Sequence, residues 1–177
     1  DRHAAARQPP TELASDVVAQ ISQRPTENMD AYDLYLKGRQ GVRTLVAPEV
    51  ARGIEQLEQA IALDPDFAAA WAHLSLGHLF SAYWGAARGR EDFDEARRGA
   101  DRALELDPDS ALARVGRAGV RSHLDLDWDG AVADLREAIE LDPTEIDAYF
   151  WLGVTLFLME RFEESVATHE IAYSMDP

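Results

Sequence analysis

Residues 138–143 read AIELDP, and similar hexapeptides occur at 60–65 (AIALDP), 103–108 (ALELDP) and 172–177 (AYSMDP). Their closing prolines are 43, 35 and 34 residues apart. A unit of about 34 residues with this ending is typical of a repeated helix–turn–helix. Proline cannot continue a helix and pushes the preceding residue toward extended geometry, so each Asp-Pro closes one unit. The sequence therefore predicts an array of helix pairs without strands.

The apolar spacing places two helices in each unit. In the last unit, Tyr149, Leu152, Gly153 and Leu156 fall at i, i+3, i+4 and i+7, which is one face of a first helix. Small and apolar residues on each second helix, such as Ala138, let the two helices approach closely. The expected pairs are 27–44 with 47–63, 67–84 with 90–106, 110–124 with 128–141, and 145–158 with 161–175, preceded by a helix at 11–23.

Polar residues after each Asp-Pro are expected to begin the next helix. Asp66, Asp109 and Thr144 can accept hydrogen bonds from the free backbone N–H groups at a helix start. Thr11 and Thr26 stand in similar Pro-Thr-Glu sequences and mark two earlier helix starts.

With four units aligned, the chain resembles a bacterial tetratricopeptide module over about residues 26–177. It resembles more closely the modules at the C-terminal ends of bacterial regulatory chains, such as CadC-like winged-helix transcriptional activators and class III adenylate and guanylate cyclases. The resemblance rests on the long second repeat and on the segments ENMDAYDLYLKGR (27–39), DLDWDGAVADLREAIELDP (125–143) and GVTLFLMERFEESVATHEIA (153–172).

This resemblance implies an all-α, right-handed solenoid of four repeats, with boundaries near 26–65, 66–108, 109–143 and 144–177. Residues 1–25 are then expected to form an N-terminal helix at the tail of a preceding domain, in a fragment of a longer chain that begins here at Asp1. Some relatives clamp the carboxyl terminus of chaperones with Lys and Asn. That clamp is not expected here, because the matching positions are Asp30, Asp33, Lys37, Ala69 and His73.

The second repeat exceeds 34 residues by nine, which we place around 81–89, between its two helices. Phe80, Tyr83 and Trp84 gather beside this excess. In one interpretation, which we favour, the first helix runs longer and packs these rings on a neighbouring repeat. In the other, they form a loop that contacts a partner.

Composition limits the classes of partner. The chain of 177 residues has 33 acidic and 17 basic side chains, a formal net charge of −16, and no cysteine. Nucleic acid and anionic membranes repel such a surface. No run approaches the roughly 20 apolar residues of a membrane span. We expect a cytoplasmic location, or a periplasmic one if the parent chain is anchored in a membrane.

The sequence contains no clear catalytic or metal-binding constellation. Asp125, Asp127, Asp129 and Gly130 resemble the start of a calcium loop, but its twelfth position, which needs a bidentate Glu, is Arg136. A turn between helices, in which Asp127 or Asp129 caps the second helix, is the simpler interpretation. The five histidines lack zinc-site spacing. We therefore expect neither an enzyme nor a bound metal or cofactor.

The first helices of the second, third and fourth repeats have a summed charge of only +2, and a solenoid binds partners on the concave wall that such helices form. Arg114, Arg117 and Arg121 form one stripe on the third of them. By analogy with the family, the predicted groove residues are His73, Leu76, Leu79, Phe80, Arg117, His123, Phe150, Trp151, Val154, Phe157 and Leu158. In the alternative interpretation, the arginines pair with acids such as Glu95 or Glu105, and a further repeat covers the aromatic residues.

The predicted function is protein–protein interaction, in the regulatory part of a larger bacterial signalling or transcription protein. A preformed concave wall would bind a peptide or helix of a protein partner that is apolar and carries an acidic group for Arg117. Two alternatives stay open. One is a sensory module that binds a small ligand and controls an attached output domain, and the other is a homodimerisation domain.

Overall fold

Helices make up the regular structure of the described part of the chain. The structure is a computed structural model, and it describes residues 25–84 and 89–175. Its helices are α2 (Met29–Arg43), α3 (Ala47–Leu63), α4 (Ala68–Trp84), α5 (Arg90–Leu106), α6 (Ala111–Val120), α7 (Trp128–Leu141), α8 (Ile146–Leu158) and α9 (Phe162–Met175), and the π-helical turn η1 (Arg121–Asp125) extends α6. Each agrees with a predicted helix to within two residues. The helix predicted at 11–23 lies outside the described residues.

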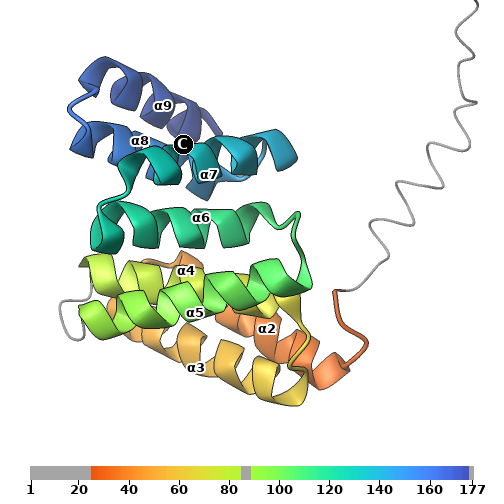
Figure 1. The fold of residues 1–177 in the computed structure, drawn as a ribbon. Helices are drawn as coiled ribbons and strands as arrows, with labels where there is room; N and C mark the ends of the chain where they lie inside the picture. The colour runs from red at the N-terminus through yellow and green to blue at the C-terminus, as the bar shows by residue number, and fades with distance from the viewer. Residues whose placement is uncertain (1–24, 85–88, 176–177) are drawn as a thin grey trace, which may run out of the picture.

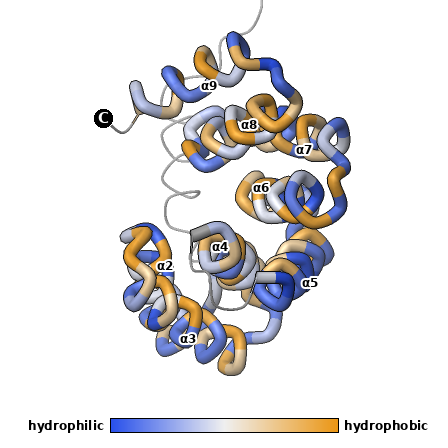
Figure 2. The backbone as a smooth tube through the Cα atoms, turned by 90° about the vertical axis from the view of Figure 1, so that its left-hand side faces the viewer, coloured by the Kyte–Doolittle hydropathy of each residue, from blue (hydrophilic) through white to orange (hydrophobic). Residues whose placement is uncertain are grey.

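The helices pair in chain order, and the pairs stack (Figure 1). α2 packs on α3, α4 on α5, α6 on α7 and α8 on α9, and each pair contacts the next. In Figure 2, α4, α6 and α8 lie on the inner side of the curved stack, while α3, α5 and α7 lie outside them. The result is the predicted all-α solenoid, whose inner wall consists of the first helix of each pair.

Small residues allow the two helices of a pair to touch. A Cβ atom on Gly53 of α3 would stand 2.7 Å from the backbone oxygen of Gly38 in α2, which is too close for a real contact. Ala60, Ala103 and Ala138 occupy the predicted small positions of α3, α5 and α7, and all three are fully buried. The core therefore runs along the stack between the inner and outer helices.

Each of the first three Asp-Pro sequences closes a helix. Asp64, Asp107 and Asp142 have the extended backbone expected before proline. In each case the side-chain Oδ1 accepts the backbone N–H of the residue two positions later, at 3.2, 3.1 and 2.9 Å. The same aspartate thus ends one helix and shapes the turn into the next repeat.

The helix caps lie one or two residues beyond their predicted positions. Ser110 caps α6 and Glu145 caps α8, so the prediction of Asp109 and Thr144 is wrong. The reason is that the turn after Asp-Pro occupies one more residue before the helix begins. Thr26 is not a cap either, because Asn28 caps α2. The Thr26 hydroxyl instead donates to Asp64 at 2.5 Å and so joins the start of the first repeat to its end.

The excess of the second repeat lengthens its helices. α4 and α5 have 17 residues each, against 13 in α8 and 14 in α9. Residues 81–84 belong to α4, in agreement with the predicted helix 67–84, and not to the connection around 81–89 in which we placed the excess. The ring of Tyr83 lies 5.4 Å from Trp151 of α8 and 5.1 Å from His123 of η1. This confirms the interpretation in which a longer helix packs its rings on neighbouring repeats.

Candidate binding groove

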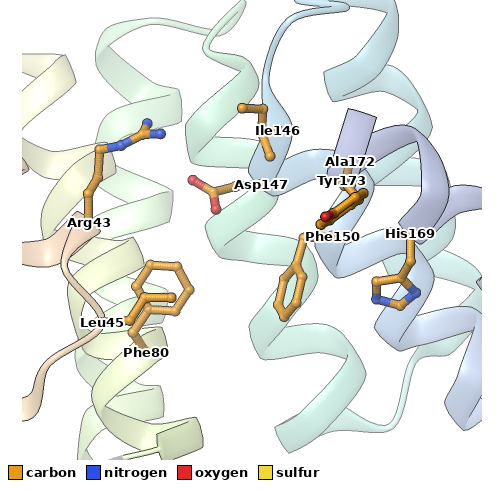
Figure 3. A pocket seen from close by; sticks show the side chains of 9 residues that line it. All are labelled: Arg43, Leu45, Phe80, Ile146, Asp147, Phe150, His169, Ala172 and Tyr173. Carbon is orange, nitrogen blue, oxygen red and sulfur yellow. The ribbon is translucent and has the colours of Figure 1, made fainter. Parts of the chain in front are cut away.

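A groove opens between the first and last helix pairs of the described solenoid. It has a volume of about 460 Å³ and lies between the end of α2, the helix α4, and the helices α8 and α9 (Figure 3). Most of its wall is apolar. The lining residues are Arg43, Leu45, Phe80, Ile146, Asp147, Phe150, His169, Ala172 and Tyr173.

Three helices supply the aromatic wall of the groove. Phe80 comes from the last part of α4 and is buried. Phe150 of α8 is half-buried and meets His169 of α9 edge-on, with 5.7 Å between ring centroids. Tyr173 is 71% exposed on α9, so an aromatic ring stands at the rim and offers contact area to a ligand.

Leu45 reaches the opposite rim from the tight turn between α2 and α3. Its φ of 55° lies in the left-handed region, which is unfavourable for leucine. Thr44 supports the turn, because its hydroxyl donates to the carbonyl of Gly41 at 2.8 Å and accepts the N–H of Val46 at 3.3 Å. The turn therefore holds an exposed apolar side chain at the edge of the groove.

The structure brings two of the predicted residues, Phe80 and Phe150, into this groove. His73 lies instead in a smaller hollow of about 280 Å³, shared with Glu145. Sequence reasoning missed the remaining polar and aromatic side chains of the groove, Arg43, Asp147, His169 and Tyr173. They come from the two ends of the stack, which only the curvature of the solenoid brings together.

Leu76 and Trp151, both predicted to face the groove, are buried. The Trp151 side chain has no exposed surface, and Leu76 is 1% exposed. The indole ring packs against Phe80 at 6.2 Å and against His123 at 5.5 Å between centroids. Trp151 thus joins α4, η1 and α8 within the core and presents no surface to a partner.

The last predicted residues of α8 lie away from the groove lining. Val154 is half-buried against the core. Phe157 is 59% exposed, and its ring lies 5.5 Å from that of Phe162 on α9. Phe157 and Phe162 thus form exposed apolar surface outside the groove.

The arginine stripe of α6 and the first residue of η1 is bound by acids of α7. Arg117 and Arg121 both donate to Asp134, at 2.6 and 2.7 Å, and Arg114 donates to Glu137 at 2.6 Å. Hydrogen bonds to Asp134 raise the pKa of Arg117. The arginines therefore pair with acids of a second helix, as the alternative interpretation expects, but the expected partners Glu95 and Glu105 are wrong. They lie on α5, whereas these arginines point toward α7.

Comparison with known proteins agrees with the fold described above. A family model described as "TPR repeat" matches residues 127–159. The fold is similar to that of a thermophilic TPR protein of Thermus thermophilus, TTC0263, with a TM-score of 0.66 over 94% of this chain and 81% of that chain, at 21% identity. The described chain has a tetratricopeptide-repeat fold.

Two curated relatives match parts of the tetratricopeptide-repeat domain. Small glutamine-rich tetratricopeptide repeat-containing protein 2 of Mycosarcoma maydis is 31% identical over 51% of this chain and 26% of its own length. The transcriptional regulator HilA of Salmonella typhimurium is 23% identical over 85% of this chain and 27% of its own length. The chain thus spans about a quarter of the length of each relative.

The start of α8 concentrates charged groups whose pKa values are displaced. Burial, followed by the charge of Asp147, raises the pKa of Glu145 to about 7. Burial also raises the pKa of Asp147, and the charge of Arg43 partly opposes this rise. In the neighbouring hollow, burial lowers the pKa of His73 to about 4. The charged forms of these groups are disfavoured because the walls of the two cavities exclude water.

The acidic stretch before α7 of the tetratricopeptide-repeat domain is an inter-helix turn, as predicted. Asp127 caps α7 by accepting the N–H of Gly130. Asp125 accepts two hydrogen bonds from Arg97, at 3.0 and 2.6 Å. Two of the three acids are thus engaged by protein groups. Within residues 25–84 and 89–175, no group of three or more His, Cys, Asp or Glu side chains is arranged to hold a metal ion.

The partly buried Ser81 and the buried Asp92 and His78 meet between α4 and α5, a cluster that sequence reasoning missed. Asp92 accepts the hydroxyl of Ser81 at 3.0 Å, and its other oxygen lies 3.0 Å from Nδ1 of His78. The carboxylate separates the hydroxyl from the imidazole, whereas a nucleophilic serine needs the base beside it. The cluster therefore links two helices.

None of the described helices has both the length and the apolar character to cross a bilayer.

Proposed function

We propose that this tetratricopeptide-repeat domain is a protein-interaction scaffold, not an enzyme, that binds a peptide or helix of a partner in the groove of Figure 3. The observation that supports it is a preformed, mainly apolar groove with exposed side chains on both rims, Leu45 and Tyr173. A wall that is already ordered limits the entropic cost of association. Aromatic side chains in such a groove supply the contact area that dominates binding energy.

The setting that we propose is the regulatory part of a larger bacterial signalling or transcription protein. The similarity to the transcriptional regulator HilA covers 85% of this chain and supports this setting. The partner is then a protein segment that is apolar and carries an acidic group. Because the guanidinium of Arg117 is already bound to Asp134, we assign the contact with that acidic group to Arg43 at the groove.

The groove can be tested without knowing the partner. Peptides selected from a random displayed library on the purified chain would be titrated by fluorescence anisotropy against two variants. Tyr173→Ala removes an exposed ring of the groove, and we expect it to weaken binding about tenfold. Phe157→Ala removes an equally exposed ring outside the groove and should leave affinity unchanged. Failure to select any peptide, or equal affinity for the Tyr173→Ala variant, would contradict the proposal.

Self-association is a second candidate, supported by the outer face of α9. Val166 stands 34 residues after Val132, its counterpart in α7. Val132 is 6% exposed beneath the following helix pair, whereas Val166 is 58% exposed. Phe162 is exposed on the same helix. A second copy could cover this apolar surface, as the next pair covers α7.

Light scattering over a micromolar to millimolar concentration series tests this candidate. If α9 mediates association, the mean mass should rise with concentration, and Val166→Glu should abolish the rise. Glu163→Gln, a change of charge on the same helix, is the matched control. A constant monomer mass would exclude self-association through α9 over that range.

A further inference from the structure

Opposite charges stand on the two facing walls of the groove. Arg43 ends α2, and Asp147 lies in the first turn of α8. Figure 3 shows the guanidinium and the carboxylate reaching from these walls into the space between them. Both residues line the groove, but they do not come within the 4.0 Å of an ion pair.

Neither of these side chains has a hydrogen-bond or ion-pair partner in the described part of the chain. The Arg43 guanidinium and the Asp147 carboxylate make no side-chain hydrogen bond or ion pair with residues 25–84 or 89–175. This differs from α6, where every arginine of the stripe is bound by an acid of α7. As far as residues 25–84 and 89–175 are concerned, the groove therefore holds one cation and one anion that can pair with groups of a ligand.

The environment of Asp147 favours such a ligand. Burial raises the pKa of its carboxyl group, and Arg43 across the groove offsets this only in part. A cation placed beside a desolvated carboxylate stabilises its charged form more than it would in water. On the opposite wall, an acidic group of the ligand would pair with the guanidinium of Arg43. Other charged or titratable groups near Asp147 are Glu145 and Asp142 before α8, and His169 and Tyr173 on α9.

Apolar side chains continue the groove beside the two facing charges. Phe80 and Leu45 lie on the wall of Arg43, and Phe150 lies on the wall of Asp147 (Figure 3). The exposed side chains of Leu45 and Tyr173 continue this apolar surface onto both rims. Exposed apolar surface thus continues outside the groove on both rims, where an extended ligand would contact it, which favours a peptide segment as the occupant.

We infer that the groove selects a peptide segment that carries an apolar side chain together with one basic and one acidic side chain, the basic group against Asp147 and the acidic group against Arg43. This inference rests on the proposed function, since it specifies the partner of the same groove. It also differs from what net charge alone implies. A chain of charge −16 attracts cationic segments in general, whereas a balanced groove prefers a segment that carries both signs.

The test uses four synthetic helical peptides with the same central Phe and different flanking residues. The flanking pairs are Lys with Glu, Lys with Lys, Glu with Glu, and Gln with Gln. Affinities would be measured by anisotropy at about 0.15 M salt, which screens long-range attraction by the acidic surface. We expect the Lys–Glu peptide to bind about tenfold more tightly than the Gln–Gln peptide, and more tightly than either peptide of one sign.

Two variants, each of which neutralises one charged side chain of the groove, test the preference for Lys and the preference for Glu separately. Asp147→Asn should remove the gain from Lys and keep the gain from Glu, and Arg43→Gln should do the reverse. Glu140→Gln and Arg136→Gln change the net charge equally at exposed sites on α7 and serve as matched controls. Binding of the Gln–Gln peptide with no preference for Lys–Glu would overturn this inference alone. Binding of none of the four peptides would overturn the proposed function, and this inference with it.

Discussion

Arg117 donates two hydrogen bonds to Asp134, from Nε to Oδ2 at 2.9 Å and from Nη2 to Oδ1 at 2.6 Å. The carboxylate is 5% exposed and the arginine side chain is 31% exposed, so the pair lies at the edge of the contact between α6 and α7. Arg121 donates to the same carboxylate. One buried acid therefore holds two arginines of the inner helix on the outer one.

We expect Asp134→Ala to lower the free energy of unfolding by about 1–3 kcal/mol, because it leaves two arginines without their acceptor. The loss stays below that of a fully buried pair, since both arginines can still reach water. Urea denaturation measures it. Glu140→Ala removes an exposed acid from the same helix and should change stability by no more than about 0.5 kcal/mol. Equal losses for the two variants would show that the network contributes nothing.

Trp151→Ala should destabilise the whole solenoid. The side chain is completely buried and packs on rings from α4 and η1, so its removal leaves a large cavity that spans two repeats. A loss of about 3–5 kcal/mol is expected from urea denaturation. Phe157→Ala on the same helix removes a ring that is 59% exposed, and it should cost far less. A Trp151→Ala variant with unchanged stability but lost peptide binding would show that the indole faces the groove after all.

The helices could be predicted from the sequence because their signals are local. Asp142 and Pro143 end α7 through the fixed backbone of proline and one side-chain hydrogen bond. The spacing of Tyr149, Leu152 and Leu156 places one face of α8 against the core without knowledge of any other repeat. Repetition of the same signals along the chain then predicts the stack.

The groove could not be predicted in the same way, because it depends on the curvature of the stack. That curvature brings Arg43, near the start of the described chain, to the same cavity as Tyr173, near its end. Likewise, the burial of Trp151 depends on how far α4 continues beyond Phe80. The sequence contains the nine extra residues, but no local pattern shows which neighbour they cover.

Leu45→Gly should separate stability from binding. Glycine adopts the φ of 55° without the steric cost that leucine has, so we expect stability to rise by about 0.5–1 kcal/mol after the entropic cost of glycine is subtracted. Binding of the selected peptides should weaken about fivefold, because the rim loses an apolar side chain. Thermal denaturation and anisotropy measure the two effects.

Leu126→Gly is the matched control for this prediction. Leu126 has a φ of 57°, is 66% exposed, and does not line the groove. Its replacement should stabilise the domain by a similar amount and leave peptide affinity unchanged. Weaker binding in both variants would mean that the effect of Leu45→Gly arises from the added glycine and not from the lost contact.

Glu145 and His73 share one hollow, and burial displaces their pKa values in opposite directions. The pKa of Glu145 rises from 4.5 to about 7, so the stability that this site contributes at low pH is lost as pH rises through that window. The pKa of His73 falls from 6.5 to about 4, so its contribution is present above pH 6.5 and is lost as pH falls toward 4. Between about pH 4.5 and 6.5 the two contributions oppose each other.

Glu145→Gln removes one of these two opposing effects, so the pH dependence of stability that arises from His73 can be measured. The amide oxygen can still accept the N–H of Asp147 and keep the cap of α8, while the titration is removed. As pH rises from 4.5 to 7.5, the free energy of unfolding of the variant should increase by about 1–3 kcal/mol relative to that of the wild type. This range allows for partial solvent screening. Urea denaturation at several pH values gives this difference directly, and Glu140→Gln should instead give a curve parallel to wild type. If Glu145→Gln also runs parallel, the carboxyl group is ionised in the folded protein and water reaches the hollow more freely than its walls indicate.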